Sequence, residues 1–234
     1  LQELIRANSL EDAKITAYHI GFVLGPCINA SGRLDTAARS LALLNAKTKE
    51  EAARLAGDLT ALNQSRKALT EKGKEEAIRI IETTELKNDR VLVVYLPDCH
   101  ESLAGIIAGR IREKYHRPAF VLTGGETSAK GSGRSIESYS MYEELVKCAD
   151  LMIQFGGHPM AAGLSIEEKN IEEFRRRLNV NCTLTDEELR PKIVIDVPMP
   201  VSYITKELVE QISLLEPFGK GNTKQVFAQK NLRV

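Results

Sequence analysis

The sequence predicts an α/β fold with a mixed sheet, preceded by a long helix and followed by the start of a further domain. Between residues 90 and 178, short apolar runs typical of strands alternate with helical segments, and such alternation is the pattern of an α/β domain. Before them, residues 49–84 are rich in Ala, Leu, Lys and Glu, with leucines at helical spacing.

Composition limits the classes of function. The chain has 234 residues, 43% of them hydrophobic, which is enough for one large domain or two small ones with buried cores. Lys+Arg and Asp+Glu both number 32, so indiscriminate binding to DNA is not expected, although a local basic groove remains compatible. No apolar run has membrane-spanning length and no signal peptide is recognisable. The scattered cysteines form no C-x-x-C and indicate reduced thiols of a cytoplasmic protein: Cys27, Cys99, Cys148 and Cys182.

The first 46 residues lack the pattern of a complete domain. The opening LQELIRAN has no initiator Met, so we expect a piece excised from a longer protein. A helical start is followed by an apolar run into Gly25-Pro26, which predicts a strand or buried segment that feeds a loop. Thr48 and Glu51 then fit a capping box. A single connecting helix over 49–84 is the preferred prediction; two helices broken near Gly73 are the alternative.

The α/β region predicts its elements in chain order. They are a strand at 91–95, a helix at 102–115, strands at 119–123 and 130–136, a helix at 140–149 with Ser140 and Glu143 as a capping box, a strand at 164–166 and a helix at 167–178. Past Pro191, the segments KIVIDVPM, LEPFGKGN and QVFAQ surround a short helix at 206–215. They indicate the first part of a third domain.

The nonapeptide FGGHPMAAG (155–163) has too few sizeable side chains for a packed helix or an ordinary strand. We therefore predict a glycine loop whose backbone something approaches closely. Adjacent glycines, here Gly156 and Gly157, allow main-chain N–H groups to point together at an anion. His158 can add a hydrogen-bond donor to a phosphate, or a proton. A tight turn with a structural histidine explains the residues equally well.

Two further segments could contact phosphate. In KGSGRS (130–135), the Ser132 hydroxyl and the Arg134 guanidinium could form a phosphate clamp, and the alternative is a surface turn with solvated charges. His100 follows the first predicted strand, where ligands of α/β sheets tend to bind. It is predicted to start a helix or to contact phosphate, because no second motif supports a metal site.

Arg33 lies in GPCINASGR, which has the composition of a loop, and Gln64 lies in LNQSR on the predicted long helix. In isolation they read as a polar loop and a solvated helix face. No catalytic triad, Walker loop or Rossmann fingerprint is present. By themselves, the residues indicate a protein that binds phosphates or phosphate backbones.

Taken in order, six motifs resemble the RecJ family, exonucleases of the DHH phosphoesterase superfamily that degrade single-stranded DNA from the 5′ end. They are GPCINASGRLD, LNQSR, CHESLAGIIAGRI, KGSGRS, FGGHPMAAG and LEPFGKGN. The family's pattern has Trp where this chain has Cys99, and Gly-Val-Ile where it has residues 102–104. Together the six cover nearly the whole chain.

The resemblance implies four parts. Residues 1–46 would be the end of the DHH catalytic domain, 47–86 a long connecting helix, 87–190 a DHH-associated α/β domain, and 191–234 the start of an OB-type domain.

The resemblance also implies roles for the residues singled out above. Gly156, Gly157 and His158 would contact the phosphate or nucleotide near the scissile bond. Ser132 and Arg134 would hold the 5′ phosphate. The strand would pass Arg33 and Gln64 on its way along the connecting helix.

The metal motifs of the family, D-H-H and D-x-D, are absent from this sequence. The resemblance implies Mn²⁺ or Mg²⁺ in the full-length enzyme, which activates the attacking water. We expect no metal to be bound by this chain, and we expect the chain alone to be catalytically inert. Single-stranded DNA is the implied substrate, and single-strand-binding protein and a helicase are the implied partners; no membrane association is expected.

Two other classes remain open. A small-substrate DHH phosphoesterase, acting on oligoribonucleotides or cyclic dinucleotides, shares the glycine motif but does not need the long helix and the LEPFGKGN segment. A non-catalytic nucleic-acid-binding module, as found in alanyl-tRNA synthetases, would not carry GPCINASGR. A purely structural scaffold would leave both glycine-rich clusters unexplained.

Overall fold

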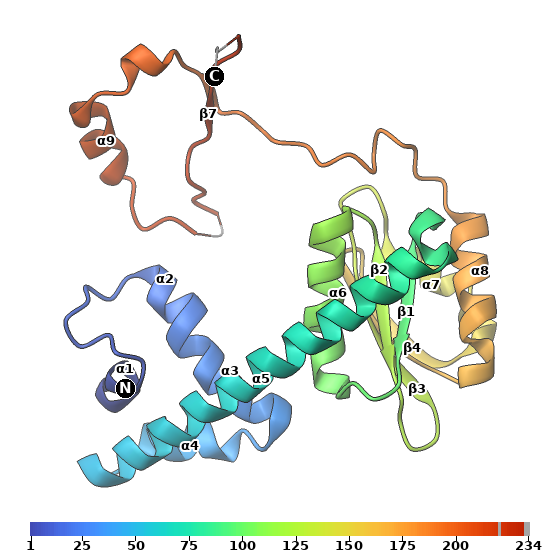
Figure 1. The fold of residues 1–234 in the computed structure, drawn as a ribbon, viewed down its shortest axis with the longest axis horizontal. Helices are drawn as coiled ribbons and strands as arrows, with labels where there is room; N and C mark the ends of the chain where they lie inside the picture. The colour runs from blue at the N-terminus through green and yellow to red at the C-terminus, as the bar shows by residue number, and fades with distance from the viewer. Residues whose placement is uncertain (220, 232–234) are drawn as a thin grey trace. The chain divides into compact units, whose positions relative to one another are not determined.

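The computed structural model describes residues 1–219 and 221–231 (Figure 1). They divide into two compact units, each described by itself. One comprises Arg33–Asp35 and Leu62–Pro191, and the other combines Leu1–Gly32, Thr36–Ala61 and the segment from Lys192. No helix in the described part of the chain is long and apolar enough to cross a membrane.

The N-terminal residues are helical. The helices are α1 (Gln2–Ala7), α2 (Ala17–His19), a π-helical turn (Ile20–Leu24), α3 (Gly25–Leu34) and α4 (Ala38–Asn45). The strand and loop predicted before Arg33 are therefore wrong. A Cβ on Gly25 would lie 2.7 Å from the carbonyl oxygen of Ile20, so glycine allows the wider turn to run directly into α3. The turn precedes Pro26, which has no N–H to donate.

Helix α5 (Lys49–Thr83) is continuous, which confirms the single long helix. The predicted capping box forms only in part. The Glu51 N–H donates to Thr48 Oγ1 at 3.2 Å, but the Glu51 carboxylate accepts from the N–H of Lys47. Gly73 does not break the helix. A Cβ there would lie 2.6 Å from Ile107 Cδ1 of α6 (Glu101–Tyr115), so the glycine allows the two helices to pack closely.

A five-stranded mixed sheet forms the centre of the second unit, as predicted. Its strand order is β1 (Leu92–Leu96), β2 (Ala119–Thr123), β3 (Ala129–Arg134), β5 (Ala161–Ile166) and β4 (Met152–His158). The β1–β2 pair is parallel, and the other pairs are antiparallel. A helix connects the two parallel strands, as this geometry requires.

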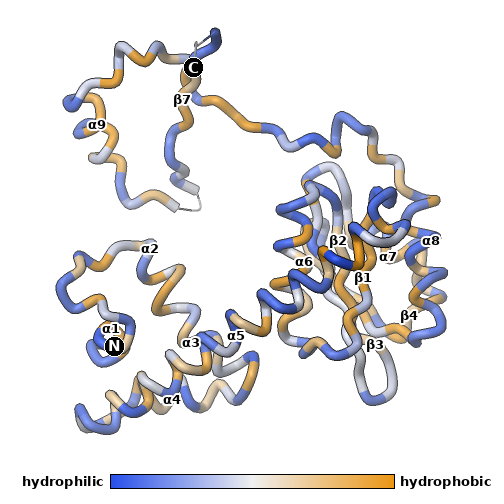
Figure 2. The backbone as a smooth tube through the Cα atoms, in the orientation of Figure 1, coloured by the Kyte–Doolittle hydropathy of each residue, from blue (hydrophilic) through white to orange (hydrophobic). Residues whose placement is uncertain are grey.

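Helices cover both faces of this sheet (Figure 1). Side chains of α5 and α6 bury one apolar cluster against β1 and β2. Side chains of α7 (Met141–Val146) and α8 (Ile171–Asn181) bury another on the opposite face. The strands are largely hydrophobic and α8 is largely hydrophilic outside (Figure 2). Ser140 is the N-cap of α7 but makes no side-chain cap bond, so the predicted Ser140–Glu143 capping box is wrong.

The nonapeptide 155–163 forms a β-hairpin, so the predicted glycine loop is wrong. Its first half is the end of β4 and its second half begins β5, and only Pro159-Met160 lie between them. Gly156 pairs with Gly163, and His158 pairs with Ala161. The ladder of main-chain hydrogen bonds stabilises these strands although their side chains are small.

The C-terminal segment contains β6 (Val197–Pro198), α9 (Lys206–Ser213) and β7 (Phe227–Ala228). β6 and β7 form a parallel pair. The helix agrees with the sequence prediction. The motif LEPFGKGN includes Lys220, which lies outside the described residues.

Candidate functional site

One face of β3, β5 and β4 carries only small and polar residues, arranged in three rows by the strand register. We call it the polar face. Alternate residues of a strand share a face, and the pairing aligns them across the three strands. The rows are Lys130–Ser165–Gln154, Ser132–Gly163–Gly156 and Arg134–Ala161–His158. Four predicted site residues therefore come together on this face: Ser132, Arg134, Gly156 and His158.

The glycines of KGSGRS face the opposite side of the sheet, where the core needs the space. A Cβ on Gly131 would lie 3.1 Å from Leu164 Cγ, and a Cβ on Gly133 would lie 2.6 Å from Phe120 Cε1. The motif thus alternates core-facing glycines with outward polar side chains. Because it is a strand within the sheet, the surface-turn alternative is wrong.

Arg134 lies along α6 in a positively charged surrounding. A Cβ on Gly105 would be 2.7 Å from Arg134 Nη2, so this glycine provides room for the guanidinium. Arg134 Nη1 donates to the carbonyl oxygen of Gly133 at 2.7 Å. Burial lowers the pKa of Arg134, and the nearby charges of Arg33 and Arg112 lower it further. This arrangement favours an anion that would offset the mutual repulsion.

Arg33 and Arg112 complete this group, which we call the arginine cluster. Arg33 Nη1 donates to the carbonyl oxygen of Ser102 at 2.9 Å. Within the part of the chain that the structure describes, Arg33 and Arg134 have no carboxylate within 4.0 Å. Arg112 Nε is buried without a hydrogen-bond partner among the same residues. Sequence reasoning missed Arg112, because nothing in the pattern of α6 separates it from a solvated helix residue.

His158 ends β4 and is exposed. Its Nδ1 accepts a hydrogen bond from the N–H of Met160 at 3.3 Å. The neutral ring therefore carries its proton on Nε2, which can donate to a ligand. The hairpin fixes the tautomer that a phosphate oxygen requires.

The two adjacent glycines differ in environment. Nothing lies within 4 Å of a Cβ built on Gly156, which is open to the polar face. Gly157 lies on the other face, has a φ of +154°, and would place a Cβ 2.6 Å from Ala162 Cα. Its backbone conformation and the approach of β5 explain Gly157, so the close neighbour at this position is the protein's own chain.

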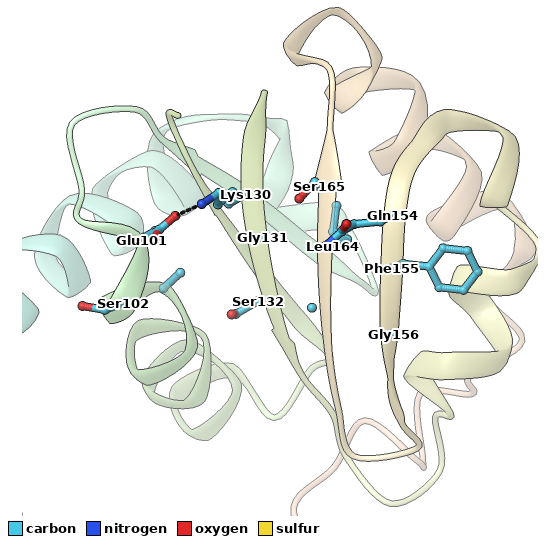
Figure 3. Close-up of a pocket in the computed structure, with 12 residues that line it drawn as sticks. Glu101, Ser102, Lys130, Gly131, Ser132, Gln154, Phe155, Gly156, Leu164 and Ser165 are labelled. Carbon is cyan, nitrogen blue, oxygen red and sulfur yellow. Dashed lines mark ion pairs between the residues drawn. The ribbon is translucent and has the colours of Figure 1, made fainter. Parts of the chain in front are cut away.

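A groove of about 570 Å³ opens on the polar face beside the start of α6 (Figure 3). It is lined by Glu101, Ser102, Ala104, Lys130, Gly131, Ser132, Gln154, Phe155, Gly156, Gly163, Leu164 and Ser165. Lys130 Nζ and Glu101 Oε2 form an ion pair of 2.6 Å across it. Figure 3 shows Lys130 and Ser132 on the same side of β3.

Two predicted site residues lie elsewhere. His100 is the N-cap of α6, where its Nδ1 accepts from the N–H of Ser102 at 3.3 Å, so the helix-start reading is observed. Gln64 is an exposed residue of α5 and does not line the groove. The structure therefore groups His100 with the groove through Ser102, and leaves Gln64 apart from it.

The described residues do not fit a metal centre. Among residues 1–219 and 221–231, no group of three or more His, Cys, Asp or Glu side chains could hold a metal ion. The chemistry that these residues can perform is anion binding, with guanidinium, hydroxyl and imidazole donors on a flat, glycine-rich strand surface.

Residues 88–182 match the DHHA1 domain family, so the sheet and its polar face define a DHH-associated domain. Residues 195–234 match the RecJ OB domain. Together with the relatives and the solved structure below, these matches place the chain in the RecJ family.

The chain is 35% identical over 230 residues to the single-stranded-DNA-specific exonuclease RecJ of Salmonella typhimurium, covering 94% of this chain and 40% of that protein. It is 35% identical over 228 residues to the RecJ exonuclease of Bacillus subtilis, covering 96% of this chain and 29% of that protein. The crystal structure of RecJ with Mg²⁺ from Thermus thermophilus matches with a TM-score of 0.81 and 28% identity, over 97% of this chain and 35% of that one. The chain thus spans less than half the length of these relatives.

Proposed function

We propose that this chain is the substrate-holding part of an exonuclease that hydrolyses single-stranded DNA from its 5′ end. The observation that carries the proposal is the arginine cluster without a neighbouring carboxylate at the edge of the polar face. Such a site binds phosphate strongly, because guanidinium groups donate in pairs to phosphate oxygens and here lack an internal competitor. Its relatives carry the activity in their names.

The residues divide the strand between them. The Ser132 hydroxyl and the Arg134 guanidinium hold the 5′ phosphate. His158, through Nε2–H, and the exposed main chain of Gly156 contact the phosphate near the scissile bond, and Gly157 contributes through its main chain alone. An anchored end sets the register in which the following bond is cut.

Three other residues guide the strand. Arg33 lies beside Ser102 at the start of α6 and adds positive charge where the strand enters. His100 provides a ring nitrogen at the same helix end, and Gln64 contacts the strand farther along α5. The division into parts at 1–46, 47–86, 87–190 and 191–234 belongs to the same proposal.

The bond cleavage requires a divalent ion held outside this chain. Relatives from Thermus thermophilus were solved with Mg²⁺ and with Mn²⁺, and such an ion supplies an activated water. The residues of this chain orient the phosphate and the strand for that attack. In the cytoplasm, single-strand-binding protein and a helicase would deliver the strand to the whole enzyme.

Fluorescence anisotropy with a short labelled single strand tests the anchoring role. The strand carries a 5′ phosphate or a 5′ hydroxyl, and each is titrated at two salt concentrations. We expect tighter binding of the phosphorylated end, weakening as salt increases. Arg134→Ala should remove about tenfold of affinity for the phosphorylated strand and little for the hydroxyl strand.

Arg176→Ala is the matched control. Arg176 lies on α8, on the other side of the sheet, and pairs with Glu173, so it should leave both affinities unchanged. Equal weakening of both strands by Arg134→Ala, or absence of binding by the unmodified chain, would contradict the anchoring role.

A further inference from the structure

The groove beside the arginine cluster differs from the cluster in charge. Its only ionised lining residues are Lys130 and Glu101, and they pair with each other at 2.6 Å. The lining is therefore electrically balanced, whereas Arg33 and Arg134 have no counterion within the described residues. A phosphate gains little in the balanced groove, and a neutral ligand with hydrogen-bonding groups fits it better.

The floor of the groove is bare backbone. Gly156 and Gly163 face each other across β4 and β5. A Cβ on Gly156 would meet nothing within 4 Å, and one on Gly163 would meet only the carbonyl oxygen of Gly131, at 3.8 Å. Neither glycine is required by internal packing, unlike Gly131, Gly133 and Gly157. Open glycines leave a flat surface on which a planar ring can lie.

The rim of the floor provides hydrogen-bonding groups. Ser165 and Gln154 stand beside Lys130 in the first row, and their side chains extend over the same side of the sheet (Figure 3). An amide side chain both donates and accepts, as the edges of nucleobases do. The row lies two residues along the strand from Ser132, a distance of about 7 Å.

We propose that this groove binds the sugar and base of the terminal nucleoside whose phosphate Ser132 and Arg134 hold. The base lies on Gly156 and Gly163, and Gln154 and Ser165 hydrogen-bond to the nucleoside. The proposal rests on the proposed function, because the anchored phosphate fixes which nucleoside reaches the groove. The groove volume of about 570 Å³ is in the range of small-ligand sites, about 300–1,000 Å³.

The test compares two 5′-phosphorylated strands that differ only in the first residue, one with thymine and one with an abasic sugar. Anisotropy titration of the unmodified chain should show about fivefold tighter binding of the strand with the base, the value of one or two net hydrogen bonds. Gln154→Ala and Gly163→Val should each reduce this ratio towards one. Both variants should keep the preference for a 5′ phosphate over a 5′ hydroxyl.

The outcomes separate this inference from the proposed function. Equal binding of both phosphorylated strands by the unmodified chain overturns the nucleoside site, while a retained 5′-phosphate preference leaves the anchoring role standing. A fivefold ratio that persists in both variants also overturns it, because the base then lies elsewhere. Gln211→Ala, an exposed residue of α9, is the control for the amide, and circular dichroism verifies that each variant is folded.

Discussion

The side chain of Asn179 pairs with the main chain of Val91 as a neighbouring strand would. Its Nδ2 donates to the Val91 carbonyl oxygen and its Oδ1 accepts from the Val91 N–H, both at 3.0 Å. The same oxygen accepts from the N–H of Arg90 at 2.9 Å. β1 has a partner strand on one side only, so this residue of α8 satisfies main-chain groups on its open side and joins the helix to the sheet.

Replacing Asn179 with Ala should lower the free energy of unfolding by about 2–3 kcal/mol. Three main-chain groups would lose their partner in a part-buried position. Asn181→Ala, near the end of the same helix, is the control and should change stability by about 0.5 kcal/mol or less. Urea unfolding followed by circular dichroism measures both, and equal effects would show that helix content alone is responsible.

The glycines of the sheet should respond to substitution according to the face they occupy. A Cβ on Gly133 would overlap Met141 Sδ and lie 2.6 Å from Phe120 Cε1, whereas one on Gly163 has room. Gly133→Ala should therefore cost about 1–3 kcal/mol of unfolding free energy through overpacking. Gly163→Ala should be neutral or slightly stabilising, because alanine restricts the unfolded chain. Urea midpoints compare them, and similar losses at both positions would contradict the assignment of faces.

The sequence was informative where periodicity decides the structure. β2 at 119–123 and the continuous helix from residue 49 agree with their predictions, because apolar runs and leucine spacing report directly on burial. The N-terminal helices were mistaken for a strand and a loop, since Gly25-Pro26 normally ends a helix. Only the π-helical turn before it, which no local propensity signals, allows the chain to continue.

For the site, residue type identified the candidates but not their arrangement. Ser132 and Arg134 were recognisable as phosphate donors, and alternation along a strand places them on one face. The hairpin at 155–163 was missed because its strands contain few strand-forming side chains, and their pairing depends on β3. Gly163 and Arg112 carry no local signal. Their surroundings come from contacts between segments distant in the sequence.

High pH should destabilise the second unit. Burial raises the pKa of the Cys148 thiol above its ordinary 9.0. Burial also raises the pKa of Tyr139 above 10.0, and raises that of Tyr95 to about 12, with a hydrogen bond to Glu168 adding to the Tyr95 shift. Below the unfolded-state values both states keep these protons, so stability is unaffected. Above them the unfolded chain releases protons that the folded chain retains, and the free energy of unfolding falls.

Urea unfolding at about pH 7.5 and at about pH 10.5 should show this loss. Tyr139→Phe is the diagnostic variant. The Tyr139 hydroxyl is buried without a hydrogen-bond partner among the described residues, so the change should stabilise the protein by about 1 kcal/mol near neutral pH. It should also reduce the loss at high pH, and an unchanged pH dependence would show that this hydroxyl does not contribute.

The chain alone should bind single-stranded DNA without cutting it, even with Mn²⁺ or Mg²⁺ added. The described residues offer an anion site but no cluster that could hold a metal ion, and an activated water requires one. Incubation of a 5′-labelled single strand with the chain and each ion, followed by electrophoresis, should show intact DNA. The RecJ exonuclease of Bacillus subtilis, of which this chain's match covers 29%, serves as the positive control in the same buffer. Metal-dependent release of nucleotides that co-purifies with the chain and disappears in Arg134→Ala would mean that this chain holds the metal itself, and would contradict the division of labour proposed above.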